Sequence, residues 1–186
     1  MRPPDRPARV YITGFMGSGK STVGPLLASA LGFDFVDLDG EIEAAEGRTI
    51  PEIFRERGER DFRLLERREL GLLRMRDGVV VATGGGTLTD PGSLSIVLES
   101  GLLVYLEVSG ETLIARLRGR KGRPMITDDD GAPLGEAALR ARVTALLLSR
   151  EDSYRRADII VDAGSQSPEA SVSAILRALR SSGRPA

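Results

Sequence analysis

The chain has 186 residues, the size of one domain. It contains neither cysteine nor histidine, which excludes disulfides, thiolate metal sites, cysteine nucleophiles, His-ligated zinc or haem, and Ser-His-Asp triads. Its 26 basic and 27 acidic residues leave a net charge of −1, which is not typical of a nucleic-acid-binding domain, and no apolar stretch approaches the roughly 18 residues of a membrane span.

The two ends of the chain differ in composition from its middle. Residues 1–9 hold three prolines and three arginines, and no apolar run of signal-peptide form follows them. We therefore expect residues 1–9 to be a disordered lead, residues 181–186 to be a tail, and the protein to be cytoplasmic. A single domain is expected over residues 10–180.

Between these ends, short buried strands alternate with helices. Val79–Ala82 is a continuous β-branched run, as in a parallel sheet that is covered on both faces. Thr49, Pro51 and Glu52 predict a capping box with proline in the first turn of a helix, which is broken near Gly58. We expect strands at 10–13, 34–37, 79–82, 102–108 and 158–161, and helices at 20–31, near 41–45, and at 49–75, 111–118, 136–148 and 168–180.

This alternation predicts an α/β fold with three layers. A five-stranded parallel sheet with right-handed crossovers would carry helices on both faces. Residues 119–135 are rich in Gly, Arg, Lys, Asp and Pro and poor in apolar side chains. Because a helix and a strand follow them, we expect a mobile flap within the domain and not a linker between domains.

The segment from Gly14 to Ser21 matches the pattern G-x-x-x-x-G-K-[ST] between a predicted strand and a predicted helix. Glycines let backbone N–H groups converge on phosphates, the lysine neutralises the β- and γ-phosphates, and the serine hydroxyl coordinates Mg²⁺. The following helix adds its N-terminal dipole. The alternative is a chance match, which is a roughly 1% event at background glycine frequencies. The predicted ATP contacts are Gly14, Gly17, Ser18, Gly19, Lys20, Ser21 and Thr22.

Among nucleotide-binding classes, a small kinase fits best. The chain contains no asparagine, so the N-K-x-D motif that reads guanine in GTPases cannot exist. Motors and AAA-type ATPases have a strand that ends in Asp-Glu, whereas Val79–Ala82 runs into Thr83 and three glycines. The size of the chain and the predicted flap favour a small P-loop kinase.

Residues 10–180 resemble the shikimate kinase family. Several segments in one order carry this resemblance: GFMGSGKSTVG, FVDLDGEIE, Thr49-Ile50 with Ile53-Phe54, GERDFRLLE, ATGGGTL, Arg123-Pro124, and Arg150 four residues before Tyr154. The resemblance implies a P-loop kinase fold with substrate-binding helices at about 39–75 and a lid at about 119–135. It further implies transfer of the γ-phosphoryl group of MgATP to the 3-hydroxyl of shikimate, in chorismate and aromatic amino-acid biosynthesis.

Asp37 and Asp39 lie two apart at the carboxyl end of a predicted strand, where parallel sheets bind ligands. By resemblance, Asp37 helps to hold Mg²⁺ together with Ser21. Asp39 would contact the substrate hydroxyls and orient or deprotonate the attacking one. The structural alternative is that Asp39 is a helix N-cap and Asp37 lies in a solvated turn.

The resemblance assigns the substrate carboxylate to two arginines, Arg63 and Arg150. Glu66 would orient Arg63, although residues three apart on a helix can equally form a surface ion pair. A guanidinium suits a planar carboxylate because it donates two parallel hydrogen bonds. Gly84, Gly85 and Gly86 form either a tight turn or a close backbone approach to the ligand. The Gly85 N–H is the favoured substrate contact among them.

The remaining assignments concern the nucleotide. By resemblance, Arg123 closes over the phosphates and stabilises the transferring charge, which makes Lys20, Asp39 and Arg123 the predicted catalytic residues. Arg116 and Gln166 would border adenine, and a solvated helix residue is the alternative for Arg116. The stretch from Met125 to Leu139 is longer and more acidic than the family pattern, and its run of three aspartates at 128–130 is expected to be a solvated loop.

Two rival functions remain open. One is a related kinase that acts on another carboxylated acceptor, such as gluconate, because two arginines suit any carboxylate. The other is a nucleotide-binding regulatory protein that has lost catalysis, although every expected polar catalytic position is filled. ATP and shikimate are the expected small-molecule partners, and the chain is expected to be a monomer without nucleic-acid or membrane partners.

Overall fold

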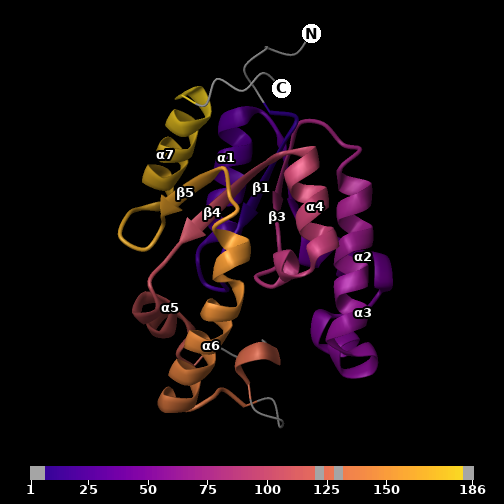
Figure 1. Cartoon of the computed structure of the whole chain (residues 1–186), viewed down its shortest axis with the longest axis vertical. Coiled ribbons are helices and arrows are strands. Elements are labelled where there is room, and N and C mark those ends of the chain that lie inside the picture. Colours follow the sequence, from indigo (N-terminus) through magenta and orange to yellow (C-terminus); the bar gives the residue numbers. More distant parts are fainter. Residues whose placement is uncertain (1–6, 120–123, 128–131, 182–186) are drawn as a thin grey trace.

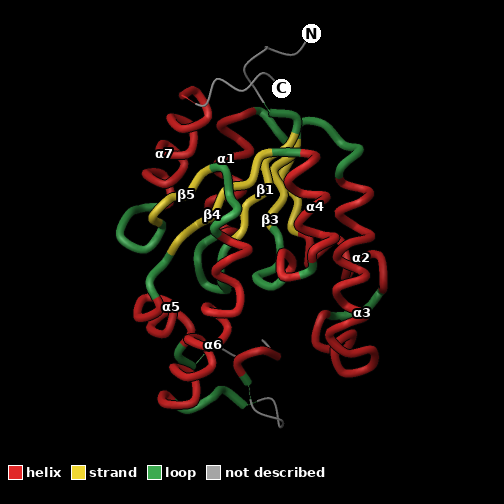
Figure 2. Tube along the Cα trace, in the orientation of Figure 1, coloured by secondary structure: helices red, strands yellow, loops and turns green. Residues whose placement is uncertain are grey.

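The structure is a computed structural model that describes residues 7–119, 124–127 and 132–181. A parallel sheet with strand order β2-β3-β1-β4-β5 forms its centre, and helices lie on both faces (Figures 1 and 2). The strands are β1 (Arg9–Thr13), β2 (Asp34–Asp37), β3 (Val79–Ala82), β4 (Leu102–Glu107) and β5 (Ile159–Asp162). The helices are α1 (Lys20–Leu31), α2 (Leu38–Glu46), α3 (Ile50–Leu73), α4 (Pro91–Ser100), α5 (Gly110–Leu117), α6 (Glu136–Tyr154) and α7 (Pro168–Ser181).

The strands are apolar on both faces because each face has its own core. Val10 and Ile12 of β1 face one core, to which α1, α5 and α7 contribute. Tyr11 of β1 and Val81 of β3 face the other core, to which α2, α3 and α4 contribute. Alternate side chains of a strand point to opposite faces, so this double burial requires continuous apolar runs. The predicted three-layer α/β architecture is confirmed.

Several predicted boundaries match the structure. The ranges of β2, β3 and α1 are those expected, and α1 ends at Gly32, whose φ of 67° is the left-handed conformation that closes a helix. The capping box at the start of α3 is present, since the Thr49 N–H donates to Glu52 Oε2 at 2.8 Å. Gly58 breaks α3 with φ 76° and ψ 176°, at the predicted position.

Three helices differ from the prediction by more than two residues, and the other predicted elements differ by two residues or fewer. Helix α2 begins at Leu38 because the Asp37 side chain accepts a hydrogen bond from the Asp39 N–H and caps it. Helix α6 continues to Tyr154, six residues beyond the predicted end. Helix α4 was not predicted, since its sequence PGSLSIVLES is poor in strong helix formers. It is stabilised by Asp90, which accepts from the Ser93 N–H at 2.8 Å.

The carboxyl ends of the strands face the space between α3 on one side and α5 and α6 on the other (Figure 1). Of the predicted flap, a short 3₁₀ turn, η2 (Pro124–Ile126), and a bridge between Thr127 and Pro133 are described. Residues 120–123 and 128–131, which include Arg123 and the three aspartates, lie outside the described residues, as do 1–6 and 182–186. None of the helices that the structure describes is long and apolar enough to cross a membrane.

Candidate active site

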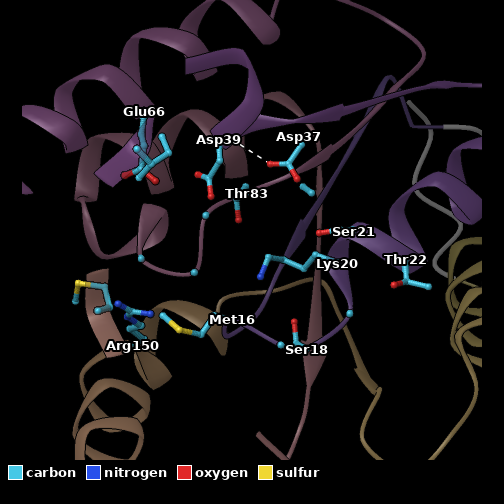
Figure 3. A pocket seen from close by; sticks show the side chains of 18 of the residues that line it. Met16, Ser18, Lys20, Ser21, Thr22, Asp37, Asp39, Glu66, Thr83 and Arg150 are labelled. Carbon is cyan, nitrogen blue, oxygen red and sulfur yellow. Dashed lines mark hydrogen bonds between the residues drawn. The ribbon is translucent and has the colours of Figure 1, made fainter. Parts of the chain in front are cut away.

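A cavity of about 830 Å³ opens at the carboxyl ends of β1, β2 and β3 (Figure 3). It brings together all of the predicted site residues that are described, except Gly14. The predicted residues that line it are Gly17, Ser18, Gly19, Lys20, Ser21, Thr22, Asp37, Asp39, Arg63, Glu66, Gly84, Gly85, Gly86, Arg116, Arg150 and Gln166. These residues come from seven separate segments of the chain, so only the fold assembles them.

The loop between β1 and α1 has the backbone that phosphate binding requires. Gly17 and Gly19 have φ values of 82° and 103°, which side-chain-bearing residues rarely adopt. Gly14 lies beneath the loop, where an added Cβ would come within 2.8 Å of the Leu106 carbonyl oxygen. The Lys20 ammonium donates to the Gly14 carbonyl oxygen at 2.7 Å and faces the cavity (Figure 3). Gly14 therefore shapes the loop and lies outside the cavity wall.

Asp37 and Asp39 lie on the side of the cavity opposite the phosphate loop (Figure 3). Asp37 ends β2 and caps α2 by accepting from the Asp39 N–H at 3.1 Å. The alternative in which Asp39 is the N-cap is wrong, because Asp39 lies in the first turn of α2. The two carboxylates share the cavity with Lys20 and Ser21, which is the arrangement that a metal–nucleotide complex would need.

Arg63 and Glu66 form a buried ion pair. Arg63 Nη1 donates to Glu66 Oε2 at 2.6 Å, and Arg63 Nη2 donates to Glu59 at 2.7 Å. Glu66 is fully buried and also accepts from Thr87 Oγ1 at 2.5 Å. Burial raises the pKa of the Glu66 carboxyl, and the Arg63 charge and the Thr87 hydroxyl oppose that rise. The surface-pair alternative is therefore wrong.

The three glycines after β3 allow neighbouring side chains to approach closely. A Cβ at Gly84 would lie 2.8 Å from Glu66 Oε1 and 3.1 Å from Asp39 Oδ1. A Cβ at Gly86 would lie 2.9 Å from Arg63 Cζ. Such spacings are below ordinary van der Waals contact, so these glycines are required for Arg63, Glu66 and Asp39 to reach the cavity. The close approach found here is to side chains, and the predicted close approach of this backbone to a ligand stays a prediction.

Arg150 enters the cavity from α6 and is only 3% exposed. Its guanidinium lies over the Phe15 ring, 5.4 Å from the centroid. Its Nη1 is buried and has no hydrogen-bond partner among the described residues. A buried, unpaired guanidinium nitrogen is costly unless a ligand pairs with it. Helix α6 continues past Asp152 to Tyr154.

The nucleotide side of the cavity is closed by Arg116 and Gln166. Arg116 donates to the Gly17 carbonyl oxygen at 3.0 Å and to the Ala163 carbonyl oxygen at 3.3 Å, so it joins α5 to the phosphate loop and to the end of β5. Gln166 donates to the Asp162 carbonyl oxygen. A solvated position for Arg116 is ruled out by these contacts, whereas contact with adenine stays a prediction.

The cavity also contains residues that were not predicted to belong to the site. Phe54 and Phe62 of α3 form an apolar wall, with ring centroids 4.6 Å apart. Thr83 and Met16 also line the cavity (Figure 3). All four lie within segments that carry the family resemblance, but apolar and hydroxyl side chains have no distinctive chemistry in the sequence, so the fold is needed to place them in the site.

The donor set around Ser21 fits magnesium. Among the described residues, no group of three or more His, Cys, Asp or Glu side chains could hold a metal by itself. Mg²⁺ commonly takes only one or two protein oxygens and completes its shell with waters and substrate phosphates. The Ser21 hydroxyl and the Asp37 carboxylate, both in the cavity, supply such oxygens.

Comparisons with known proteins agree with this geometry. The family model "Shikimate kinase" matches residues 16–180. A shikimate kinase from Chlorobaculum tepidum is 42% identical over 168 residues, which cover 90% of this chain and 88% of the relative. A structure of shikimate kinase from Acinetobacter baumannii in complex with shikimate has a TM-score of 0.86 at 33% identity, covering 95% of this chain and 94% of that one.

A gluconokinase from Sinorhizobium meliloti is also similar in structure, but less so. Its TM-score is 0.57 at 21% identity, covering 92% of this chain and 91% of that one, so the likeness concerns the fold alone. The family model and the curated relative carry the assignment instead. The chain belongs to the shikimate kinase family.

Proposed function

We propose that this cavity transfers the γ-phosphoryl group of MgATP to the 3-hydroxyl of shikimate, giving shikimate 3-phosphate and ADP. As a member of its family, the chain is a phosphotransferase with an alcohol group as acceptor. The observation that best supports the proposed acceptor is the buried Nη1 of Arg150, which has no hydrogen-bond partner in the described part of the chain and lies in a cavity that also holds a phosphate loop. A carboxylate on the acceptor would pair with this nitrogen.

Arg63 and Arg150 would hold the shikimate carboxylate between α3 and α6. Arg63 is kept in place by Glu66 at 2.6 Å and Glu59 at 2.7 Å, so little side-chain freedom is lost when it binds. A charge-assisted hydrogen bond in a site of low dielectric is stronger than one in water. The apolar wall of Phe54 and Phe62 would face the ring of the acceptor.

The acceptor hydroxyls would lie at the first turn of α2. Asp39 belongs to that turn, and the Asp37 cap fixes its backbone. We assign Asp39 to orient the attacking hydroxyl and to accept its proton. The N–H groups of Gly84, Gly85 and Gly86 would supply further contacts, with Gly85 favoured.

The triphosphate would occupy the loop from Gly14 to Thr22. Backbone N–H groups and the α1 dipole would bind its oxygens, and Lys20 would neutralise charge on the β- and γ-phosphates. Ser21 and Asp37 would hold Mg²⁺, which, when bound, offsets negative charge on the phosphates. Positioning and charge neutralisation therefore account for most of the rate enhancement.

The segment 119–135 is proposed as the lid, with Arg123 over the transferring phosphoryl group. Met125, on the described part of this segment, lines the cavity, which supports a lid that borders the nucleotide. Closure would exclude water and suppress hydrolysis of ATP. The adenine ring would lie near Arg116 and Gln166, which line the cavity beside the phosphate loop.

The experiment that tests this function is ADP release from MgATP with separate acceptors. Shikimate, gluconate and nucleoside monophosphates are supplied in parallel, and ADP is measured by a coupled assay. We expect turnover to depend on shikimate alone. ADP release only with another acceptor would refute the assigned substrate, and ATP binding without turnover on any acceptor would favour a regulatory protein. The expected monomeric state and cytoplasmic location are checked separately by size-exclusion chromatography and cell fractionation.

A further inference from the structure

Tyr154 lies at the end of α6 and has no role in the phosphoryl transfer proposed above. Its side chain is 1% exposed, and its ring stacks on Tyr105 of β4 with centroids 4.9 Å apart. The hydroxyl donates to the Gly85 carbonyl oxygen at 2.5 Å. Tyr154 lies four residues after Arg150, and residues at this spacing share one face of a helix. One face of α6 therefore carries both Arg150, which lines the cavity, and Tyr154, which contacts the glycine turn formed by residues 84–86.

The Gly85 backbone is held in a narrow space. A Cβ at Gly85 would lie 3.3 Å from Arg150 Nη1, 3.4 Å from the Met16 nitrogen and 3.5 Å from the Gly14 carbonyl oxygen. The glycine turn thus passes between the phosphate loop and α6. A small rotation of this backbone would change where its N–H groups point.

The carbonyl that Tyr154 contacts belongs to the peptide group between Gly85 and Gly86. That peptide is planar and trans, so its N–H, which is that of Gly86, points away from the oxygen. A hydrogen bond that fixes the oxygen therefore also fixes the direction of the Gly86 N–H. Gly86 lines the cavity beside Arg63.

We propose that Tyr154 is a positioning residue: its hydroxyl fixes the Gly85–Gly86 peptide and thereby aims the Gly86 N–H at the acceptor. This inference rests on the proposed function, because the acceptor is taken to be shikimate. Burial raises the pKa of Tyr154 to about 12, while the charge of Arg150 and a hydrogen bond from it oppose the rise. The hydroxyl therefore stays protonated, and able to donate, at any pH near neutrality.

The chain offers a matched control for removing one buried tyrosine hydroxyl. Tyr11 is fully buried in β1, and its hydroxyl is hydrogen-bonded to Ser100 Oγ at 2.8 Å. Ser100 ends α4, and neither residue lines the cavity. Tyr154→Phe and Tyr11→Phe each delete one hydroxyl and keep the ring, so both should lower the melting temperature by a few degrees.

The test compares steady-state kinetics of the two variants with those of the wild type. We expect Tyr154→Phe to raise the shikimate KM by about three- to tenfold and to leave the ATP KM unchanged, whereas Tyr11→Phe should leave both unchanged. Calorimetric binding of shikimate should weaken by the same factor in Tyr154→Phe alone. Equal shikimate constants in the two variants would overturn the positioning role.

Two further measurements distinguish a failure of the proposed function from a failure of the role proposed for Tyr154. A wild type that shows no shikimate-dependent ADP release refutes the proposed function, independently of Tyr154. The wild type also gives a test that needs no variant: the amide proton resonance of Gly86 should shift, and its exchange with solvent should slow, when shikimate is added. An unchanged Gly86 amide on shikimate binding would contradict the proposed direction of this N–H.

Discussion

The substitution Gly86→Ala should change the geometry of the site while leaving the stability of the fold nearly unchanged. Gly86 has φ −113° and ψ −4°, a conformation open to alanine, so the substitution adds no backbone strain. The new Cβ would overlap Arg63 Nη2, the nearest atom, and would lie 2.9 Å from Arg63 Cζ, whereas ordinary contact begins at 3.4 Å. The contact is with the far end of a flexible side chain, and we therefore expect the guanidinium to move while the backbone stays in place.

The size of the effect follows from this displacement. Relieving the contact requires the Arg63 guanidinium to shift by about 1 Å, and a misplacement of that size costs about 100-fold in rate. This corresponds to about 2.7 kcal/mol of transition-state stabilisation. We expect kcat/KM for shikimate to fall by this factor while the ATP KM stays constant.

The assay measures shikimate kinetics and the melting temperature together, with Gly71→Ala as control. Gly71 lies within α3, and an added Cβ would meet no atom within 4 Å. This control should leave kinetics unchanged and stabilise the protein by about 0.5–1 kcal/mol. If Gly86→Ala folds normally and retains wild-type kcat/KM for shikimate, the role assigned to Arg63 is refuted.

Three further substitutions test other parts of the account. Lys20→Met should reduce turnover by at least about 1,000-fold, because it removes the cation that neutralises the phosphates, and should lower the melting temperature by no more than a few degrees through loss of the hydrogen bond to the Gly14 carbonyl oxygen; substantial residual turnover would contradict this. Arg150→Met should raise the shikimate KM at least about 30-fold. Because the substitution removes a buried charge, the melting temperature should stay the same or rise. A large loss of stability with a normal shikimate KM would instead show that Arg150 has a structural role. Asp90→Ala should cost about 1 kcal/mol at neutral pH through loss of the α4 cap. Hydrogen bonds from Arg67 and Ser93 lower the pKa of Asp90 below its ordinary 3.8, so this difference should shrink as the pH falls below about 4, and thermal denaturation at pH 7 and pH 3 measures it.

Local signals were enough to predict much of the fold. The β-branched run of Val79–Ala82 and the capping box at Thr49 specify their elements within a few residues, and both are confirmed. Helix α4 escaped prediction because it depends on the Asp90 cap and on burial of Val97 rather than on propensity. Tertiary packing can override a weak local preference.

The site likewise contains some residues that a local motif predicts and others that only contacts between distant segments bring together. The phosphate loop is contiguous in the chain, so its motif identifies it without the fold. The burial of Glu66 and the partners of Thr87 and Tyr154 arise from contacts between distant segments, at separations of 21 and 69 residues. No spacing in the sequence encodes such contacts, and only the assembled sheet brings the residues together.

The central claim is that two arginines recognise a carboxylated acceptor in this cavity. The most direct measurement compares kcat/KM for shikimate with kcat/KM for shikimate methyl ester, whose carboxylate is masked, in the wild type and in Arg63→Ala. We predict that the wild type prefers shikimate by at least about 100-fold, since charge-assisted hydrogen bonds are lost with the ester, and that Arg63→Ala loses much of this preference. Equal use of the two acceptors by the wild type would contradict the account.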